Sequence, residues 1–384
     1  VSIAPEEVES VIVLKDAAAV ALYGYKGING AINIVTKRGK YNTRSVKVTY
    51  DHLFTSLANK PKFVDAYTYG LAVNEARIND GMTGRYSNQE LNALRDGTMP
   101  YLYPNVNWVD ETFRDNAMTN KYNIEFRGGG EKFRYYTMLD LISNKGFVKE
   151  PGANEGYSTQ DKYVKGNLRM NMDIDLTKTT DLQVNLLGVL QETSRPGAQA
   201  DLWDLVYTVP SAAFPIRDKN GVWGGSDTWA GTQNPVAQSV GAAYYKNHTR
   251  SLFADMKLTQ DLSGLTKGLN AFVRISYDNI ANIYEDHSKE YVYSVNAPTW
   301  ADGASEPTVK SEIYGKDSEM GTEAKTNEFD RLLHFDVGFN YQRTFGDHSI
   351  YSQLKWDYEN NDPNGINNLS LIHISEPTRH AQIS

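Results

Sequence analysis

The feature that most constrains this chain is a run of about thirteen residues, 164–176, in which apolar and polar side chains alternate. The even positions carry mainly apolar residues, such as Val164 and Met172, and the odd positions carry polar residues, such as Asp173. Successive side chains of a β-strand point to opposite faces. The run therefore predicts one strand with an apolar face and a polar face, about twice as long as the usual five or six residues.

Eight further segments show the same alternation, so the sequence predicts nine strands. The mean hydropathy of -0.53 and the lack of a long apolar run exclude a helical membrane protein. They do not exclude a membrane β-barrel, whose strands carry apolar residues only at every second position. The predicted strands contain residues 46–50, 122–126, 133–141, 164–176, 182–186, 252–258, 269–277, 333–341 and 350–358.

The connections between these strands alternate between short and long. Tight turns are predicted at 128–131, 177–180, 263–267 and 345–347, and long loops at 56–119, 145–161, 194–248 and 284–328. Tight turns at one end of the strands and large loops at the other are typical of outer-membrane barrels. A soluble β-sandwich or propeller is the alternative, but its strands are shorter and its connections do not sort by length. The sequence therefore favours an all-β fold, a transmembrane antiparallel β-barrel.

The polar faces of the predicted strands are strongly charged. They carry Arg169, Asp173, Asp255, Lys257 and Arg274, among others. These side chains are too polar for the dry interior of a small barrel. We therefore expect a wide lumen that holds water or a plug.

Composition and motifs argue against several other classes of protein. The chain has no Cys, which excludes disulfides, thiolate metal sites and cysteine nucleophiles. Its net charge of -8 argues against a nucleic-acid partner. No HExxH or GxSxG motif is present, and the Asp218–Gly221 segment reads as a turn and not as a calcium loop. We therefore expect no catalytic residue, no cofactor and no metal site, and we do not expect an enzyme.

The N-terminal forty residues resemble a known family. Residues 13–39 read VLKDAAAVALYGYKGINGAINIVTKRG, which is similar to the end of the plug domain of the SusC/RagA family of TonB-linked (TonB-dependent) outer-membrane transporters. The residues predict a strand from Val8 to Leu14, a short helix from Ala17 to Leu22, and a second strand around Ile32–Val35. The plug motif comprises Leu14, Lys15, Asp16, Tyr23, Gly24, Gly27, Asn29, Gly30, Thr36, Lys37, Arg38 and Gly39.

The resemblance implies a division of the chain into three parts. Residues 1–40 would be the C-terminal part of an α+β plug domain, and residues 41–368 the N-terminal part of the barrel, about nine of twenty-two strands. Residues 369–384 include LSLIHISEPTR, which is similar to a translated sequencing adapter, so we expect this tail to be derived from an adapter. We accordingly expect an internal fragment that lacks a signal peptide and a TonB box.

The resemblance also implies a function and partners. Members of the family import large nutrients, either glycan oligosaccharides or peptides, through the bacterial outer membrane, in contact with its lipid. A SusD-like lipoprotein would form a lid over the barrel, and TonB would act through an N-terminal segment. A homodimer of transporter–lid pairs is a further assembly that the resemblance allows. The alternatives are a passive porin or adhesion barrel, which leaves residues 5–40 unexplained, and a soluble glycan-binding β-protein.

Five aromatic residues of the predicted 194–248 loop are candidates for contact with a ligand. Aromatic rings stack on sugars and also fill peptide pockets. Long folded loops also need cores of their own, so we expect these residues to pack the loop or to contact a lid more than to contact a ligand. The candidates are Trp203, Trp223, Trp229, Tyr244 and Tyr245.

Overall fold

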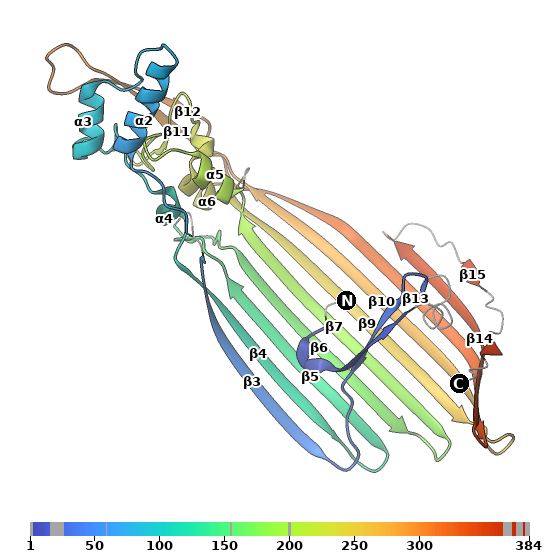
Figure 1. The fold of residues 1–384 in the computed structure, drawn as a ribbon. Helices are drawn as coiled ribbons and strands as arrows, with labels where there is room; N and C mark the ends of the chain where they lie inside the picture. The colour runs from blue at the N-terminus through green and yellow to red at the C-terminus, as the bar shows by residue number, and fades with distance from the viewer. Residues whose placement is uncertain are drawn as a thin grey trace.

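Nine long strands form one curved antiparallel sheet (Figure 1). The computed structural model describes residues 3–15, 27–58, 60–153, 156–198, 201–363, 371–373 and 379–380. All nine predicted strands are confirmed. They are β3 (Arg44–Ser56), β4 (Asn116–Gly129), β5 (Phe133–Lys145), β6 (Lys162–Asp175), β7 (Thr180–Pro196), β9 (Ala243–Asp261), β10 (Leu269–Ser288), β13 (Gly321–Phe345) and β14 (His348–Pro363).

Each long strand pairs with the next long strand along the chain, and the connections sort by length as predicted. The turns 130–132, 176–179, 262–268 and 346–347 lie at one end of the sheet, and the loops 57–115, 146–161, 197–242 and 289–320 lie at the other (Figure 1). Two short segments, β15 (Leu371–His373) and β16 (Arg379–His380), pair with β14. Among the described residues, no helix has both the length and the apolar character needed to cross a membrane.

Two strands extend well beyond the segments that the sequence predicts. β10 has 20 residues and β13 has 25, and their backbone pairing continues from Leu269–Tyr341 to Ser288–Gly321. Polar residues such as Asn279 and Arg331 interrupt the apolar alternation. Hydrogen bonding between backbones does not depend on the side chains, so the ladder continues where the sequence pattern ends.

The two faces of the sheet invert the usual pattern of burial in a globular protein. On the convex face, Leu139, Leu168 and Leu190 are 49%, 43% and 65% exposed. On the concave face, Asn167 and Asn171 are each only 1% exposed. An apolar exterior around a polar interior is the arrangement of a barrel in lipid.

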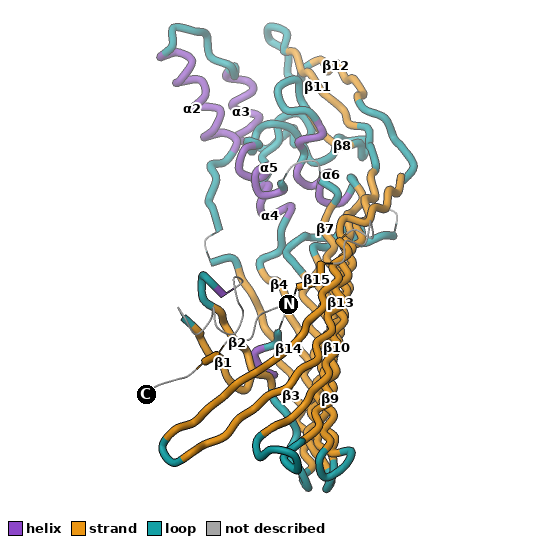
Figure 2. Tube along the Cα trace, turned by 90° about the vertical axis from the view of Figure 1, so that its right-hand side faces the viewer, coloured by secondary structure: helices purple, strands orange, loops and turns teal. Residues whose placement is uncertain are grey.

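The long connections fold into a separate region at one end of the sheet (Figures 1 and 2). Side chains cap several of its helices: Asp65 accepts from the Thr68 backbone, and Ser87 forms a capping box with Glu90. The elements are α2 (Ala66–Asn79), α3 (Asn88–Asp96), α4 (Trp108–Thr112), α5 (Leu202–Thr208), α6 (Pro235–Val240) and the 3-10 helix η3 (Gly231–Gln233), with a three-stranded sheet of β8 (Trp223–Gly225), β11 (Tyr293–Thr299) and β12 (Thr308–Tyr314).

A hairpin near the N-terminus lies against the concave face of the large sheet (Figure 2). A 3-10 turn, η1 (Pro5–Glu7), precedes β1 (Val8–Leu14), which pairs antiparallel with β2 (Ala31–Thr36). The two strands predicted in this segment are therefore confirmed. The predicted helix at 17–22, together with Asp16, Tyr23 and Gly24, lies outside the described residues.

Candidate functional site: the N-terminal hairpin on the concave wall

The N-terminal hairpin, residues 3–15 and 27–36, meets the concave wall first through Glu7. This side chain is fully buried, and its Oε1 accepts a hydrogen bond of 2.8 Å from the Ala4 backbone N–H. The guanidinium of Arg169, on β6, donates through Nε to Glu7 Oε2 and through Nη2 to Oε1 at 3.4 Å. The aromatic ring of Tyr136 and the side chain of Met138 are completely buried beside Ala4. The first contact is therefore a buried ion pair that is held by hydrogen bonds and surrounded by packed side chains.

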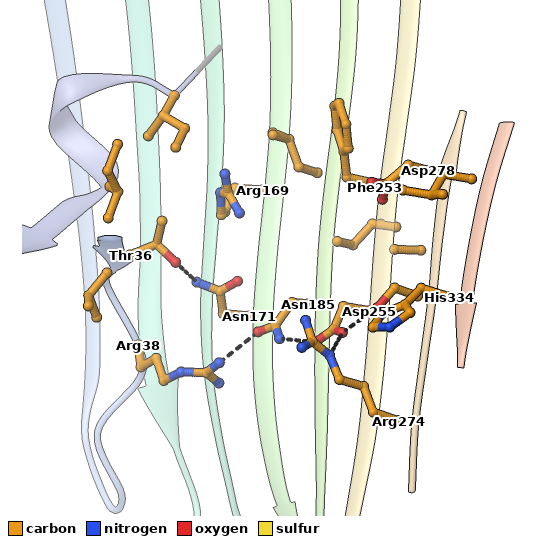
Figure 3. Close-up of a pocket in the computed structure, with 18 of the residues that line it drawn as sticks. Thr36, Arg38, Arg169, Asn171, Asn185, Phe253, Asp255, Arg274, Asp278 and His334 are labelled. Carbon is orange, nitrogen blue, oxygen red and sulfur yellow. Dashed lines mark hydrogen bonds and ion pairs between the residues drawn. The ribbon is translucent and has the colours of Figure 1, made fainter. Parts of the chain in front are cut away.

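The segment that follows β2 continues this contact along the same wall. Asn171 Nδ2 donates to Thr36 Oγ1 at 3.0 Å and to the Lys37 carbonyl at 2.8 Å (Figure 3). Arg38 forms an ion pair with Asp173 on β6 and donates to Asn185 Oδ1 on β7 at 2.8 Å. The side chains of this segment thus contact two adjacent strands.

Two glycines of the predicted motif occupy positions that a larger residue would not fit. Gly30 has a φ of +87°, and a Cβ atom there would lie 3.0 Å from the Leu14 carbonyl oxygen. At Gly39 a Cβ atom would lie 2.3 Å from the Tyr135 backbone nitrogen on β5. The first glycine permits the turn into β2, and the second allows the linker to pass directly against the sheet.

The remaining motif residues in the described part have more ordinary roles. Gly27 is buried, and its carbonyl accepts from the Gly30 N–H at 2.9 Å. Asn29 lies in the same turn, and Lys15 follows the last residue of β1. Lys37 Nζ lies 3.5 Å from Glu125 Oε2 on β4, and the Lys37 N–H donates to the Glu7 carbonyl. Glu7 itself was not singled out by the sequence pattern, although Arg169 was predicted on the polar face.

A cavity of about 580 Å³ opens between the hairpin and the wall (Figure 3). Asp255 is the centre of its polar lining: it accepts from Asn185 Nδ2 and Ser276 Oγ, each at 2.9 Å, and pairs with Arg274. The other labelled polar residues of the lining are Thr36, Arg38, Arg169, Asn171, Asp278 and His334. The predicted charged face therefore lines a polar space beside the hairpin, as expected for a lumen that holds water or a plug.

The structure does not gather the five aromatic candidates into one site. Trp203 stacks on Phe113 with ring centroids 4.1 Å apart, and Trp229 packs against the same hydrophobic cluster. Trp223 is only 8% exposed and contributes to a second cluster with Tyr291. All three tryptophans therefore help to form the cores of the loop region. Their contact with a ligand stays a prediction.

The two adjacent tyrosines of β9 point to opposite faces of the sheet. Tyr244 lies on the convex face and stacks on His287, with ring centroids 4.2 Å apart. Tyr245 lies on the concave face, where the guanidinium of Arg195 lies 4.4 Å from its ring centroid and Tyr284 packs at 4.2 Å. Of this pair, only Tyr245 faces the lumen side of the sheet, so its contact with a ligand is the geometrically simpler prediction.

A second cavity, of about 470 Å³, lies within the loop region and was not foreseen from the sequence. Its lining combines Tyr101, Asn220, Asn296 and Ser311 from three separate connections. A ring together with amide and hydroxyl groups suits a polar organic ligand. Because these residues are distant in sequence, no local motif could have identified them.

Taken together, these features define a class of protein. Long antiparallel strands that are apolar outside and polar inside form a curved sheet, and a hairpin is fixed to its inner wall. This is part of a plugged β-barrel of the outer-membrane type, with an open sheet in which β3 and β14 do not pair.

Comparison with known proteins finds similar receptors. No protein-family profile matches the chain. TonB-dependent receptor P26 of Formosa agariphila is 25% identical over 261 residues, which are 65% of this chain and 23% of that receptor. TonB-dependent receptor SusC of Bacteroides thetaiotaomicron is 31% identical over 147 residues, which are 38% of this chain and 13% of SusC. These similarities support a TonB-dependent receptor of the SusC/RagA type.

Solved structures agree at the level of the fold. The RagAB peptide importer in its closed-closed state superposes with a TM-score of 0.63 at 15% identity, over 98% of this chain and 43% of that chain. Its open-open state gives a TM-score of 0.64 at 16% identity, over 94% and 39%. The chain thus spans less than half of the importer chain and about a quarter of receptor P26.

Proposed function

We propose that the chain forms part of a TonB-dependent importer of large nutrients in the bacterial outer membrane. In this proposal residues 1–40 are the end of the plug, residues 41–368 are the first part of the barrel, and residues 369–384 are an adapter-derived tail. The observation that carries the proposal is the attachment of the hairpin to the inner wall through Glu7–Arg169 and Arg38–Asp173. A wide pore without an obstruction would leak, so a plug fixed by polar contacts fits a pore that opens only when work is done on it.

The partners follow from the same family. A SusD-like lipoprotein would cover the loop end, and TonB would act on the plug from the opposite side. The names of the relatives, a receptor called SusC and a peptide importer called RagAB, support this assembly. Either glycan oligosaccharides or peptides would be the cargo, and a homodimer of transporter–lid pairs would be the larger assembly.

An uptake experiment tests the proposal. Cells that produce the complete protein should take up a labelled oligosaccharide or peptide, and the uptake should stop when an uncoupler collapses the proton-motive force. Membrane fractionation should find the protein in the outer membrane. A passive pore would instead continue to admit small solutes after uncoupling, and a soluble binding protein would not sediment with the membrane.

Growth of a strain that lacks the gene distinguishes the two classes of cargo. A deletion strain that grows normally on peptides but poorly on oligosaccharides would assign a glycan importer, and the reverse pattern would assign a peptide importer. Normal growth and uptake with both kinds of cargo would contradict the proposed function.

A further inference from the structure

On the convex face, the apolar side chains end at a definite position on each of four adjacent strands. Toward the loop region, the last apolar residues are Leu141 on β5, Val164 on β6, Leu190 on β7 and Leu252 on β9. The next outward-facing residues on these strands are polar. In a membrane this boundary would lie where hydrocarbon gives way to lipid headgroups.

Two to six residues beyond this boundary, one hydrogen-bonded row crosses the same four strands. The row continues on β10, where Glu285 lies directly opposite Lys246. Lys145 on β5 lies directly opposite Lys162 on β6, Lys162 lies opposite Ser194 on β7, and Ser194 lies opposite Lys246 on β9. Directly opposed residues share a face, and Lys145 shares its face with Leu141 because the two are four residues apart. We call Lys145, Lys162, Ser194 and Lys246 the lysine row. The row therefore places three ammonium groups on the convex face, near the loop ends of adjacent strands.

The acidic groups in this part of the convex face are directed at other partners. Glu192 Oε2 lies 3.6 Å from His248 Nδ1, and Glu285 lies 3.5 Å from His248 and 3.3 Å from His287. Within the described part of the chain, none of the three lysines has a carboxylate within ion-pair distance. The ammonium group of Lys246 instead lies 5.3 Å from the ring centroid of Tyr244.

This arrangement has an unfavourable electrostatic term that an anion would remove. Like charges directly opposite each other on neighbouring strands destabilise a sheet, and Lys145 and Lys162 are such a pair. An anion between their side chains would convert this repulsion into two attractions, and a phosphate group accepts several charge-assisted hydrogen bonds. Basic groups just outside the hydrocarbon attract anionic headgroups.

We propose that the lysine row binds the phosphate groups of a glycolipid headgroup in the leaflet on the loop side of the membrane. The proposal rests on the proposed function, since it requires the convex face to lie in the outer membrane. Lipid bound in this way would restrain β5, β6, β7 and β9 at the level where they enter the loop region. It would not contact the lumen, because the row faces away from the concave wall.

The test uses the complete protein, reconstituted in phosphatidylcholine nanodiscs that contain diphosphoryl lipid A, with bound lipid counted by native mass spectrometry. The combined K145Q, K162Q and K246Q variant should bind diphosphoryl lipid A at least about ten-fold more weakly than the unaltered protein, because three charges that attract the phosphates are removed. The matched control removes the same charge from the tight turns at the other end of the sheet, as K132Q, K178Q and K267Q. It should bind as the unaltered protein does. Lysine-to-arginine changes in the row should also preserve binding.

Three results would overturn the proposal. These are equal binding by the glutamine variant, equal loss in the turn control, or equal binding of a dephosphorylated lipid with the same acyl chains. Displacement of the lipid by inorganic phosphate alone would assign the row to a free anion and would also contradict it. Uptake of cargo and outer-membrane fractionation are measured in the same variants. If both are normal while lipid binding is unchanged, the headgroup site fails and the importer stands; if the unaltered protein is absent from the outer membrane, the importer itself fails.

Discussion

Breaking the Glu7–Arg169 pair should release the N-terminal hairpin from the wall without unfolding the sheet. Glu7 is fully buried and the Arg169 side chain is 10% exposed. Removing one member of such a pair leaves the other as an uncompensated buried charge, which costs about 3–5 kcal/mol. In Arg169→Met, the Glu7 carboxylate would keep only the 2.8 Å bond from the Ala4 N–H. Since each 1.4 kcal/mol is a factor of ten, we expect hairpin opening to become about two to three and a half orders of magnitude more frequent.

Hydrogen exchange of the backbone amides in the complete protein measures this opening. The reporter is the Lys37 N–H, which donates to the Glu7 carbonyl at 2.8 Å, and it should lose protection in Arg169→Met. Amides in the middle of β6 and β7 should keep their protection.

The matched control is Arg274→Met, which breaks the Arg274–Asp255 pair on the same concave wall. The Arg274 and Asp255 side chains are 44% and 21% exposed. Loss of this pair should therefore lower the free energy of unfolding by no more than about 1 kcal/mol. The double variant Glu7→Gln with Arg169→Met should cost less than the sum of the single changes, because the two residues interact directly. The reasoning would be refuted if Arg169→Met left the protection of Lys37 unchanged, or if Arg274→Met reduced it equally.

Three further predictions concern the linker, the loop region and the sheet edges. Gly39→Ala should lower the free energy of unfolding by about 1–3 kcal/mol, because the new Cβ would meet the Tyr135 backbone. The control Gly152→Ala, which has open space around it, should leave thermal unfolding unchanged. Equal effects would count against the close approach at Gly39. Trp203→Ala should remove the stack on Phe113 and lower the free energy of unfolding by about 1–3 kcal/mol, because the ring is partly buried. The loop region should then become sensitive to protease, and unchanged digestion would exclude a core role. The 384-residue chain alone should give no defined conductance step in planar bilayers, because β3 and β14 do not pair with each other and open edges are not tolerated in lipid. A regular conductance step would contradict this.

The secondary structure of the loop region could not be predicted from the sequence. Its helices and small sheet were expected only as long loops. Their cores join segments far apart in the chain, as when Trp108 donates to the Pro210 carbonyl at 3.0 Å. The amphipathic pattern of such short elements is weak, since most of their stability comes from tertiary packing and little from local propensity.

The aromatic candidates show a similar limit for the site. The sequence places the aromatic residues Trp203 and Tyr245 in a predicted loop, but an aromatic ring can pack in a protein core as well as it can bind a ligand. Only the folded chain distinguishes the stack of Trp203 on Phe113 from the lumen-facing position of Tyr245. The five candidates have different environments, although they lie within one stretch of sequence.

Sequence alone determined the nine strands, their two faces and the presence of two short strands at 8–14 and around 32–35. These features are periodic or local, and the geometry of a strand converts an alternating pattern directly into faces. Tertiary structure alone decided that Glu7 pairs with Arg169, 162 residues away, and that Lys145, Lys162 and Lys246 share one row. Register and docking depend on contacts between distant segments, and no local pattern of residues encodes which of many compatible partners will meet.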